Sequence, residues 1–265
     1  MQCGFDTGYG LDFMALHVSP LVAGNWKMNG LRSNLNEVAL VREAVAAGSA
    51  GSAEVLICPP ATLLMAVAAI CEGSSLKCGG QDCHAEPGGA FTGDVSAGML
   101  KDAGASYVIV GHSERRASHH ESNETVRLKA QAALRAGLTP IICIGETLEE
   151  REKGHALATV SAQLAGSVPD KFVPGSIVVA YEPVWAIGTG LTPAQPEIAE
   201  MHSFIREEIA RHLPEQGNGL RVLYGGSVKA ENVAELLSAR DVDGALVGGA
   251  SLNAAAFMEI AGFYR

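Results

Sequence analysis

The segment AYEPVWAIGTGL, from Ala180 to Leu191, is the most informative stretch of the sequence because it places a carboxylate directly after a short apolar run that is consistent with a strand buried on both faces. The residues from Ile177 to Ala180 are apolar and rich in β-branched side chains, which is typical of a strand in a parallel sheet covered by helices. Pro183 stops the strand, so Glu182 emerges at its carboxyl end. The Gly-rich end of the segment predicts a loop that can close over a ligand and exclude water.

Outward from this segment, short apolar runs alternate with helical patterns along the chain, which indicates βα units around a parallel sheet. The predicted strands are Leu21–Gly24, Val55–Cys58, Leu76–Gly79, Tyr107–Val110, Pro140–Cys143, Ile177–Tyr181, Arg221–Leu223 and Ala245–Val247. Predicted helices include Asn34–Ala47, Thr62–Cys71, Glu121–Ala136 and Pro193–Leu213. A capping box of Thr192 and Gln195 is expected to start the last of these helices, and Gly137 suits a left-handed cap after Ala136.

Eight parallel strands can close into a barrel or stay open as a doubly wound sheet, and periodicity alone does not choose between them. In a barrel, catalytic groups come from the carboxyl ends of several strands and meet at one face. Polar or glycine residues follow the first, fourth, sixth, seventh and eighth predicted strands, namely Asn25, Lys27, His112, Glu182, Ser227 and Gly248. Because a barrel brings these residues together and an open sheet spreads them apart, we predict an α/β fold with an eight-stranded parallel (β/α)8 barrel.

The length of 265 residues fits one barrel domain, although two smaller domains would also fit it. We expect residues 20–265 to form a single (β/α)8 barrel domain. Residues 1–19 show no clear periodicity, so we expect them to form an N-terminal extension, not all of which need belong to the native chain.

Composition excludes several classes of function. The formal net charge of -10 and the lack of a cationic cluster argue against nucleic-acid binding. The longest apolar helical run, Leu63–Cys71, is too short to cross a bilayer, so no membrane partner is expected. Six cysteines without CxxC spacing, together with the absence of a targeting signal, indicate a reducing cytoplasm. His119 and His120 are adjacent and would point in different directions on a helix, so no metal site is predicted.

Two strand ends carry side chains suited to stabilising negative charge. Asn25 and Lys27 stand at alternate positions in GNWKMNG and therefore share a face, where the lysine can stabilise an anion and the amide can hydrogen-bond. His112 follows an apolar strand where a helix can begin, and helix N–H groups disfavour a cationic imidazole there. A neutral His112 can still donate to a carbonyl oxygen. The simpler alternatives are a solvated lysine in a turn and a structural histidine.

Two Gly-rich segments, YGGSV from Tyr224 and VGGAS from Val247, follow the last two predicted strands. Barrel enzymes commonly bind phosphate there, through backbone N–H groups at glycine turns and helix starts. Each segment alone is also compatible with an ordinary turn.

Two further features lie at the end of the fifth predicted strand. Cys143 is expected to be a buried structural thiol. The segment Gly145–Glu152 is expected to be a charged helix start with a solvated acidic face.

From Pro20 to the C-terminus, the chain contains, in this order, the strings AGNWKMNG, GAFTGD, VGHSERR, CIGETLEERE, AYEPVWAIGTG, YGGSV and LVGGASL. In these strings and in their order, the chain resembles the triosephosphate isomerase family. This resemblance implies a TIM barrel that interconverts dihydroxyacetone phosphate and glyceraldehyde 3-phosphate through an enediolate, without a cofactor or a metal. An isomerase of another phosphorylated sugar and a phosphate-binding scaffold without turnover are the alternatives.

The resemblance also implies roles for individual residues. Glu182 resembles the catalytic base, His112 the neutral electrophile, and Lys27 with Asn25 the support for the enediolate. The residues that resemble the phosphate-binding backbone are Gly188, Ser227, Gly248 and Gly249.

A homodimer is implied as well, in which the segment with Phe91 and Thr92 enters the partner subunit. Two positions depart from the family pattern: Leu191 stands where many members carry Lys, and Asp94 replaces the more familiar Glu.

Overall fold

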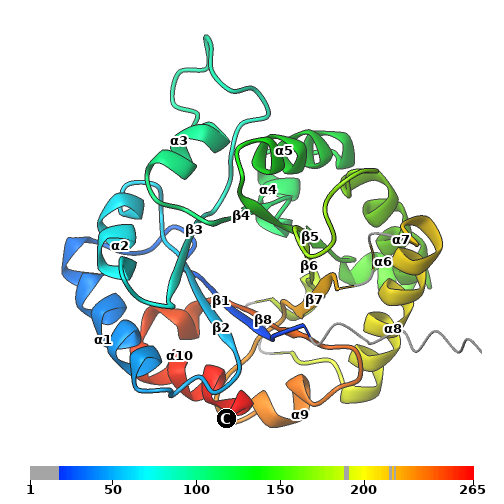
Figure 1. Ribbon diagram of the computed structural model, residues 1–265. Coiled ribbons are helices and arrows are strands. Elements are labelled where there is room, and N and C mark those ends of the chain that lie inside the picture. The colour runs from blue at the N-terminus through cyan, green and yellow to red at the C-terminus, as the bar shows by residue number, and fades with distance from the viewer. Residues whose placement is uncertain (1–17, 188–190, 215–216, 218) are drawn as a thin grey trace, which may run out of the picture.

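The computed structural model describes residues 18–187, 191–214, 217 and 219–265. Its strands form one closed parallel barrel in sequence order from β1 to β8 (Figure 1). They are β1 Leu21–Asn25, β2 Glu54–Cys58, β3 Lys77–Gly80, β4 Tyr107–Val110, β5 Thr139–Ile144, β6 Val178–Tyr181, β7 Arg221–Tyr224 and β8 Gly244–Val247. Because β8 pairs with β1, the predicted closed barrel is confirmed and the open sheet is ruled out.

Helices lie outside the strands and cover the outer face of the barrel (Figure 1). They are α1 Leu35–Ala46, α2 Leu64–Cys71, α3 Ala97–Asp102, α4 Ser113–Ser118, α5 Asn123–Arg135, α6 Leu148–Glu152, α7 Ala156–Ser167, α8 Gln195–His212, α9 Val233–Leu237 and α10 Ala254–Ala261. Short 3₁₀ turns are η1 Arg32–Asn34, η2 Val184–Ala186, η3 Gly249–Leu252 and η4 Gly262–Tyr264. This arrangement leaves both faces of the strands buried.

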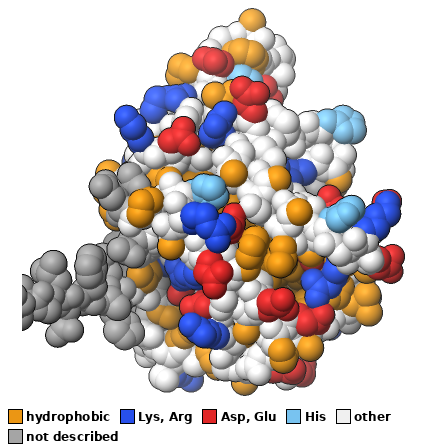
Figure 2. Space-filling view, turned by 90° about the vertical axis from the view of Figure 1, so that its right-hand side faces the viewer, with side chains coloured by type: hydrophobic (Ala, Val, Ile, Leu, Met, Phe, Trp, Pro, Cys, Tyr) orange, Lys and Arg blue, Asp and Glu red, His pale blue; other side chains and the backbone are white. Residues whose placement is uncertain are grey.

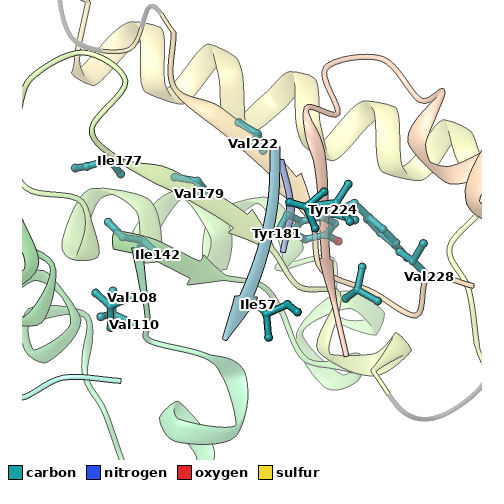
Figure 3. Packing of buried hydrophobic residues seen from close by; sticks show 14 of the residues in the cluster. Ile57, Val108, Val110, Ile142, Ile177, Val179, Tyr181, Val222, Tyr224 and Val228 are labelled. Carbon is teal, nitrogen blue, oxygen red and sulfur yellow. The ribbon is translucent and has the colours of Figure 1, made fainter. Parts of the chain in front are cut away.

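The core has two layers because successive strand side chains point to opposite faces. One layer fills the barrel interior and includes Leu56, Ile109 and Cys143. The other lies between the barrel and the helices, where Val108 and Val179 pack (Figure 3). Burial on both faces explains why the strands read as continuous apolar runs.

Two helix ends test the predicted capping signals. Gly137 adopts a positive φ of 73° after α5, which confirms the left-handed cap. The predicted capping box at Thr192 is wrong, since α8 begins at Gln195. The carboxylate of Glu197 accepts the N–H of Ala194 at 2.8 Å, so this side chain satisfies the first free amide of the helix.

The surface carries both signs of charge. Figure 2 shows Lys, Arg, Asp and Glu side chains interspersed on one face, with no continuous basic stripe across it. Within the described ranges, no helix combines the length and apolar character needed to span a bilayer.

The segment 81–96, between β3 and α3, projects from the barrel at the top of Figure 1.

Candidate active site

A cavity of about 580 Å³ lies at the carboxyl ends of β1, β4, β6, β7 and β8. The predicted site residues in its wall are Asn25, Lys27, His112, Glu182, Ser227, Gly248 and Gly249. Gly188 and the adjoining part of the predicted closing loop, residues 188–190, lie outside the described residues. The topology therefore brings together side chains that are far apart in the sequence.

Glu182 is a buried carboxylate just after β6, where its N–H donates to the carbonyl of Ile144 at 2.7 Å. Its Oε2 accepts the N–H of Ser113 at 2.9 Å, and its Oε1 lies 2.9 Å from Nε2 of His112. Burial raises the pKa of Glu182, but His112, the Ser113 amide and Lys27 together outweigh burial and hold it below its usual value. The group is therefore ionised at neutral pH and able to accept a proton.

His112 precedes α4, and its Nδ1 accepts the backbone N–H of Glu114 at 3.2 Å. Because a backbone amide only donates, Nδ1 must carry a lone pair, which assigns the proton of the ring to Nε2. Burial lowers the pKa of His112, whereas the Glu182 carboxylate raises it, and the net direction is upward. A second proton would break the Nδ1 hydrogen bond, so this geometry holds the neutral tautomer with Nε2–H donating to Glu182.

Lys27 follows β1 with a φ of 52°, a left-handed conformation that is uncommon for a residue with a side chain. Oδ1 of Asn25 accepts its N–H at 3.0 Å, and Nε2 of Gln81 donates to its carbonyl at 2.9 Å. Its Nζ lies 2.6 Å from Oε1 of Glu114. These contacts fix the ammonium group at the edge of the cavity that contains Glu182.

Glycine and serine residues form another part of the cavity wall. Gly248 follows β8 and Gly249 begins η3, while Oγ of Ser227 donates to the carbonyl of Ala186 at 2.8 Å. That hydrogen bond ties the turn after β7 to η2, next to the carboxylate. A Cβ on Gly225 would lie 2.9 Å from Cγ of Glu182, so a residue with a side chain there would displace the base.

Sequence reasoning missed several residues that support the site. Gln81 and the amide of Ser113 position Lys27 and Glu182, respectively. Gln81 immediately follows β3, so a search for polar side chains at the carboxyl end of the third strand would have found it. No local pattern marks the Ser113 amide, because its partner comes from a distant strand.

The predicted solvated acidic face is wrong at Glu146, which is fully buried. Its Oε1 accepts from the hydroxyl of Tyr181 at 3.1 Å and from Nε1 of Trp185 at 2.9 Å, and Arg151 adds a third donor. Converging donors explain how a carboxylate is accommodated there. Cys143 is buried in the barrel interior, as predicted, and burial together with Glu182 raises the pKa of its thiol.

His119 and His120 are both exposed. Across the part of the chain that the structure describes, no group of three or more His, Cys, Asp or Glu side chains is placed to hold a metal ion.

Known proteins are similar to this chain in sequence and in fold. A family model described as triosephosphate isomerase matches residues 20–264. The triosephosphate isomerase of Ruegeria pomeroyi is 58% identical over 242 residues, covering 91% of this chain and 95% of the relative. That of Xanthobacter flavus is 56% identical over 243 residues, with 91% and 96% covered. A crystal structure of triosephosphate isomerase from Bartonella henselae is similar with a TM-score of 0.87 and 48% identity, covering 94% of this chain and 100% of that one.

Proposed function

This chain belongs to the triosephosphate isomerase family, and from that premise we propose that Glu182, His112 and Lys27 interconvert dihydroxyacetone phosphate and D-glyceraldehyde 3-phosphate in the cavity described above. The observation that carries this assignment is that a carboxylate, an imidazole and an ammonium group line one cavity. Asn25 acts beside them by holding the backbone of Lys27.

The phosphate group binds at the glycine wall. Ser227, Gly248 and Gly249 line the same cavity as the carboxylate, and Gly188 completes the proposed set. Backbone N–H groups at the end of a strand and the start of a helical turn suit an anion, because the aligned peptide dipoles favour negative charge there. A phosphate held at this wall places the rest of a three-carbon substrate toward Glu182.

Glu182 is the base that moves the proton. As an ionised carboxylate, it removes a proton from the carbon next to the carbonyl and returns it to the adjacent carbon. In the structure, its oxygens are bonded to Ser113 and His112, so it must leave these partners to reach the substrate. The same movement releases Nε2–H of His112, which then donates to the substrate oxygen.

Negative charge develops on the substrate oxygen in the enediolate. Nε2–H of His112 and the ammonium group of Lys27 stabilise it, and fixed donors in a site sheltered from water are the most effective form of such stabilisation. The left-handed backbone of Lys27, held by Asn25 and Gln81, aims the ammonium group before the substrate arrives. No step in this sequence uses a cofactor or a metal.

The protein acts as a homodimer in this proposal, through the projecting segment 81–96. Phe91 is 42% exposed, and its ring lies 4.0 Å from that of His84, which gives the segment a preformed apolar tip with Thr92 beside it. A receptor for such a tip is the cavity of about 290 Å³ between Lys27 and His119, next to the active site. A partner segment seated there would shield Lys27 from water.

We also propose that residues 20–265 form one domain, because the last strand of this segment pairs with its first.

A cytoplasmic location is proposed because the described thiols are not joined in disulfides. The cysteines that the structure describes are all buried and unpaired, which is typical of a reducing compartment.

A coupled enzymatic assay with glyceraldehyde 3-phosphate, run beside larger sugar phosphates at equal concentration, tests the assignment. We expect turnover of the triose phosphate and none of the others. Preferential turnover of another sugar phosphate would assign the cavity to a different isomerase, and binding of phosphate compounds without turnover would leave a passive scaffold.

A further inference from the structure

A group of four charged side chains lies beside the active site, and the proposed reaction uses none of them. These side chains, the ion network, are Asp82, Arg115, Glu121 and Lys129. Asp82 belongs to the start of the segment 81–96, Arg115 to α4 and Lys129 to α5, while Glu121 lies between the two helices. Asp82 and Arg115 also line the cavity of about 290 Å³ next to Lys27.

Opposite charges alternate through the ion network. Nζ of Lys129 lies 2.7 Å from Oδ1 of Asp82 and 2.6 Å from Oε1 of Glu121. Nη2 of Arg115 lies 2.8 Å from Oδ2 of Asp82, and its Nε lies 2.7 Å from Oε1 of Glu121. Each of the four groups therefore contacts two groups of opposite formal charge, and the contacts form a closed ring.

A gain in stability does not explain why charges occupy this place. Glu121 and Lys129 are buried. Taking charges out of water is costly, and well-packed apolar side chains in place of a buried ion pair often leave the fold as stable or more stable. Charged hydrogen bonds do fix their partners at short and directed distances. The ion network therefore holds the start of the segment 81–96, α4 and α5 in one arrangement.

Two members of the ion network adjoin, in the chain, the residues that hold Lys27. Asp82 follows Gln81, whose Nε2 donates to the carbonyl of Lys27 at 2.9 Å. Arg115 follows Glu114, whose Oε1 lies 2.6 Å from Nζ of Lys27. The ion network thus fixes the residue that holds the backbone of Lys27 and the residue that holds its ammonium group.

We propose that the four side chains of the ion network are positioning residues for Lys27 and affect the reaction only through it. The inference rests on the role of Lys27 in the proposed function. Lys27 has a left-handed backbone, a conformation that persists only where the surrounding structure holds it. With Gln81 and Glu114 fixed, the ammonium group is in place before charge develops on the substrate, so no rearrangement is needed at that moment.

A double-mutant cycle with Lys27 tests this inference. Asp82→Ala and Lys27→Met are made singly and together in the full-length chain. The coupled assay gives kcat/KM for glyceraldehyde 3-phosphate at a temperature where circular dichroism shows every variant folded. Asp82→Ala should lower kcat/KM by about tenfold in the parent chain, because a misplaced catalytic group can cost up to about 10²-fold. In the Lys27→Met background it should cost less than about twofold, since the two residues act as a unit.

Asp243→Ala is the matched control. The side chain of Asp243 is 23% exposed, against 24% for Asp82, and it also pairs with an arginine, Arg206. Asp243 immediately precedes β8, so it lies at the amino end of the strands, away from the active site. We expect this variant to unfold at lower urea concentration with an unchanged kcat/KM. Equal losses of kcat/KM in Asp82→Ala and Asp243→Ala would trace both to destabilisation and would overturn the inference.

A second variant, Lys129→Met, reaches the ion network from α5 and should depend on Lys27 in the same way. If it fails to fold, the cycle with Asp82→Ala decides alone. Equal fold losses with and without Lys27, or no loss in the parent chain, would overturn the inference. A loss that disappears as the enzyme concentration rises would also overturn it, because the cause would then be assembly of the proposed dimer.

The same cycle separates a failure of this inference from a failure of the proposed function. Lys27→Met alone reports whether the ammonium group takes part in the reaction. A parent-like kcat/KM in that variant would overturn the proposed role of Lys27 and this inference with it. A large loss in Lys27→Met, with equal effects of Asp82→Ala in both backgrounds, would overturn this inference and leave the role of Lys27 in place.

Discussion

Replacing Gly225 by alanine probes how closely the base is positioned. A Cβ at this position would lie 2.9 Å from Cγ of Glu182 and 3.0 Å from the carbonyl oxygen of Tyr181. Carbon atoms in comfortable contact are about 3.5–4.0 Å apart, so Glu182 has to move by roughly 0.6–1.1 Å. Gly225 does not have a positive φ, so alanine introduces crowding without backbone strain.

We expect kcat to fall by about 10- to 100-fold, because a misplacement of about 1 Å in a catalytic group can cost about 10²-fold in rate. Overpacking should also lower the free energy of unfolding by about 1–3 kcal/mol. The coupled assay gives kcat at a temperature where the variant is folded, and urea denaturation gives its stability.

Gly98→Ala is the matched control for this substitution. It lies in α3, and the nearest atom to its added Cβ, Oγ of Ser96, is 3.8 Å away, so kcat should not change. A Gly225→Ala enzyme with the kcat of the parent chain would show that the space at Gly225 does not control the position of Glu182 during the reaction.

Three further predictions concern charge, stability and assembly. Burial lowers the pKa of His202 to about 4, below its usual 6.5, so the unfolded chain binds the proton more readily than the folded chain. The free energy of unfolding should therefore fall by up to roughly 3 kcal/mol as the pH drops from 6.5 toward 4. Urea denaturation across that range should show a flatter pH dependence for His202→Gln, and an unchanged slope would refute the assignment. Lys27→Met should lower kcat by about 10²–10³ with little loss of stability, and a parent-like kcat would remove Lys27 from the oxyanion support. Phe91→Glu should shift the particle mass seen by light scattering from dimer toward monomer, and a dimer of undiminished stability would place the interface elsewhere.

Much of the fold followed from local rules. Buried parallel strands are continuous apolar runs, which is why all eight predicted strands overlap those of the structure. A barrel directs the carboxyl ends of all its strands to one face. Polar residues that follow the predicted strands were therefore expected to meet there, and Asn25, Lys27, His112 and Glu182 do line one cavity. These features depend only on the alternation of strands and helices along the chain and on their order.

The features that sequence could not supply depend on contacts between distant segments. The Ser113 amide that holds Glu182 comes from 69 residues earlier in the chain. In the sequence, Glu146 is one of several acidic residues in a charged stretch. Only the fold shows the hydrogen-bond donors that surround its buried carboxylate. The predicted cap at Thr192 was wrong because α8 begins at Gln195, where the carboxylate of Glu197 accepts the N–H of Ala194.

Deuterium exchange in D₂O measures whether Glu182 carries the proton between the two carbons. The parent chain and Glu182→Gln are each mixed with dihydroxyacetone phosphate, and NMR follows deuterium entering the carbon that exchanges its proton, beside product formation. We expect the variant to lose both processes together, by about 10²–10⁴-fold or more, while binding of inorganic phosphate stays nearly intact. Exchange at the parent rate in Glu182→Gln would show that another group carries the proton.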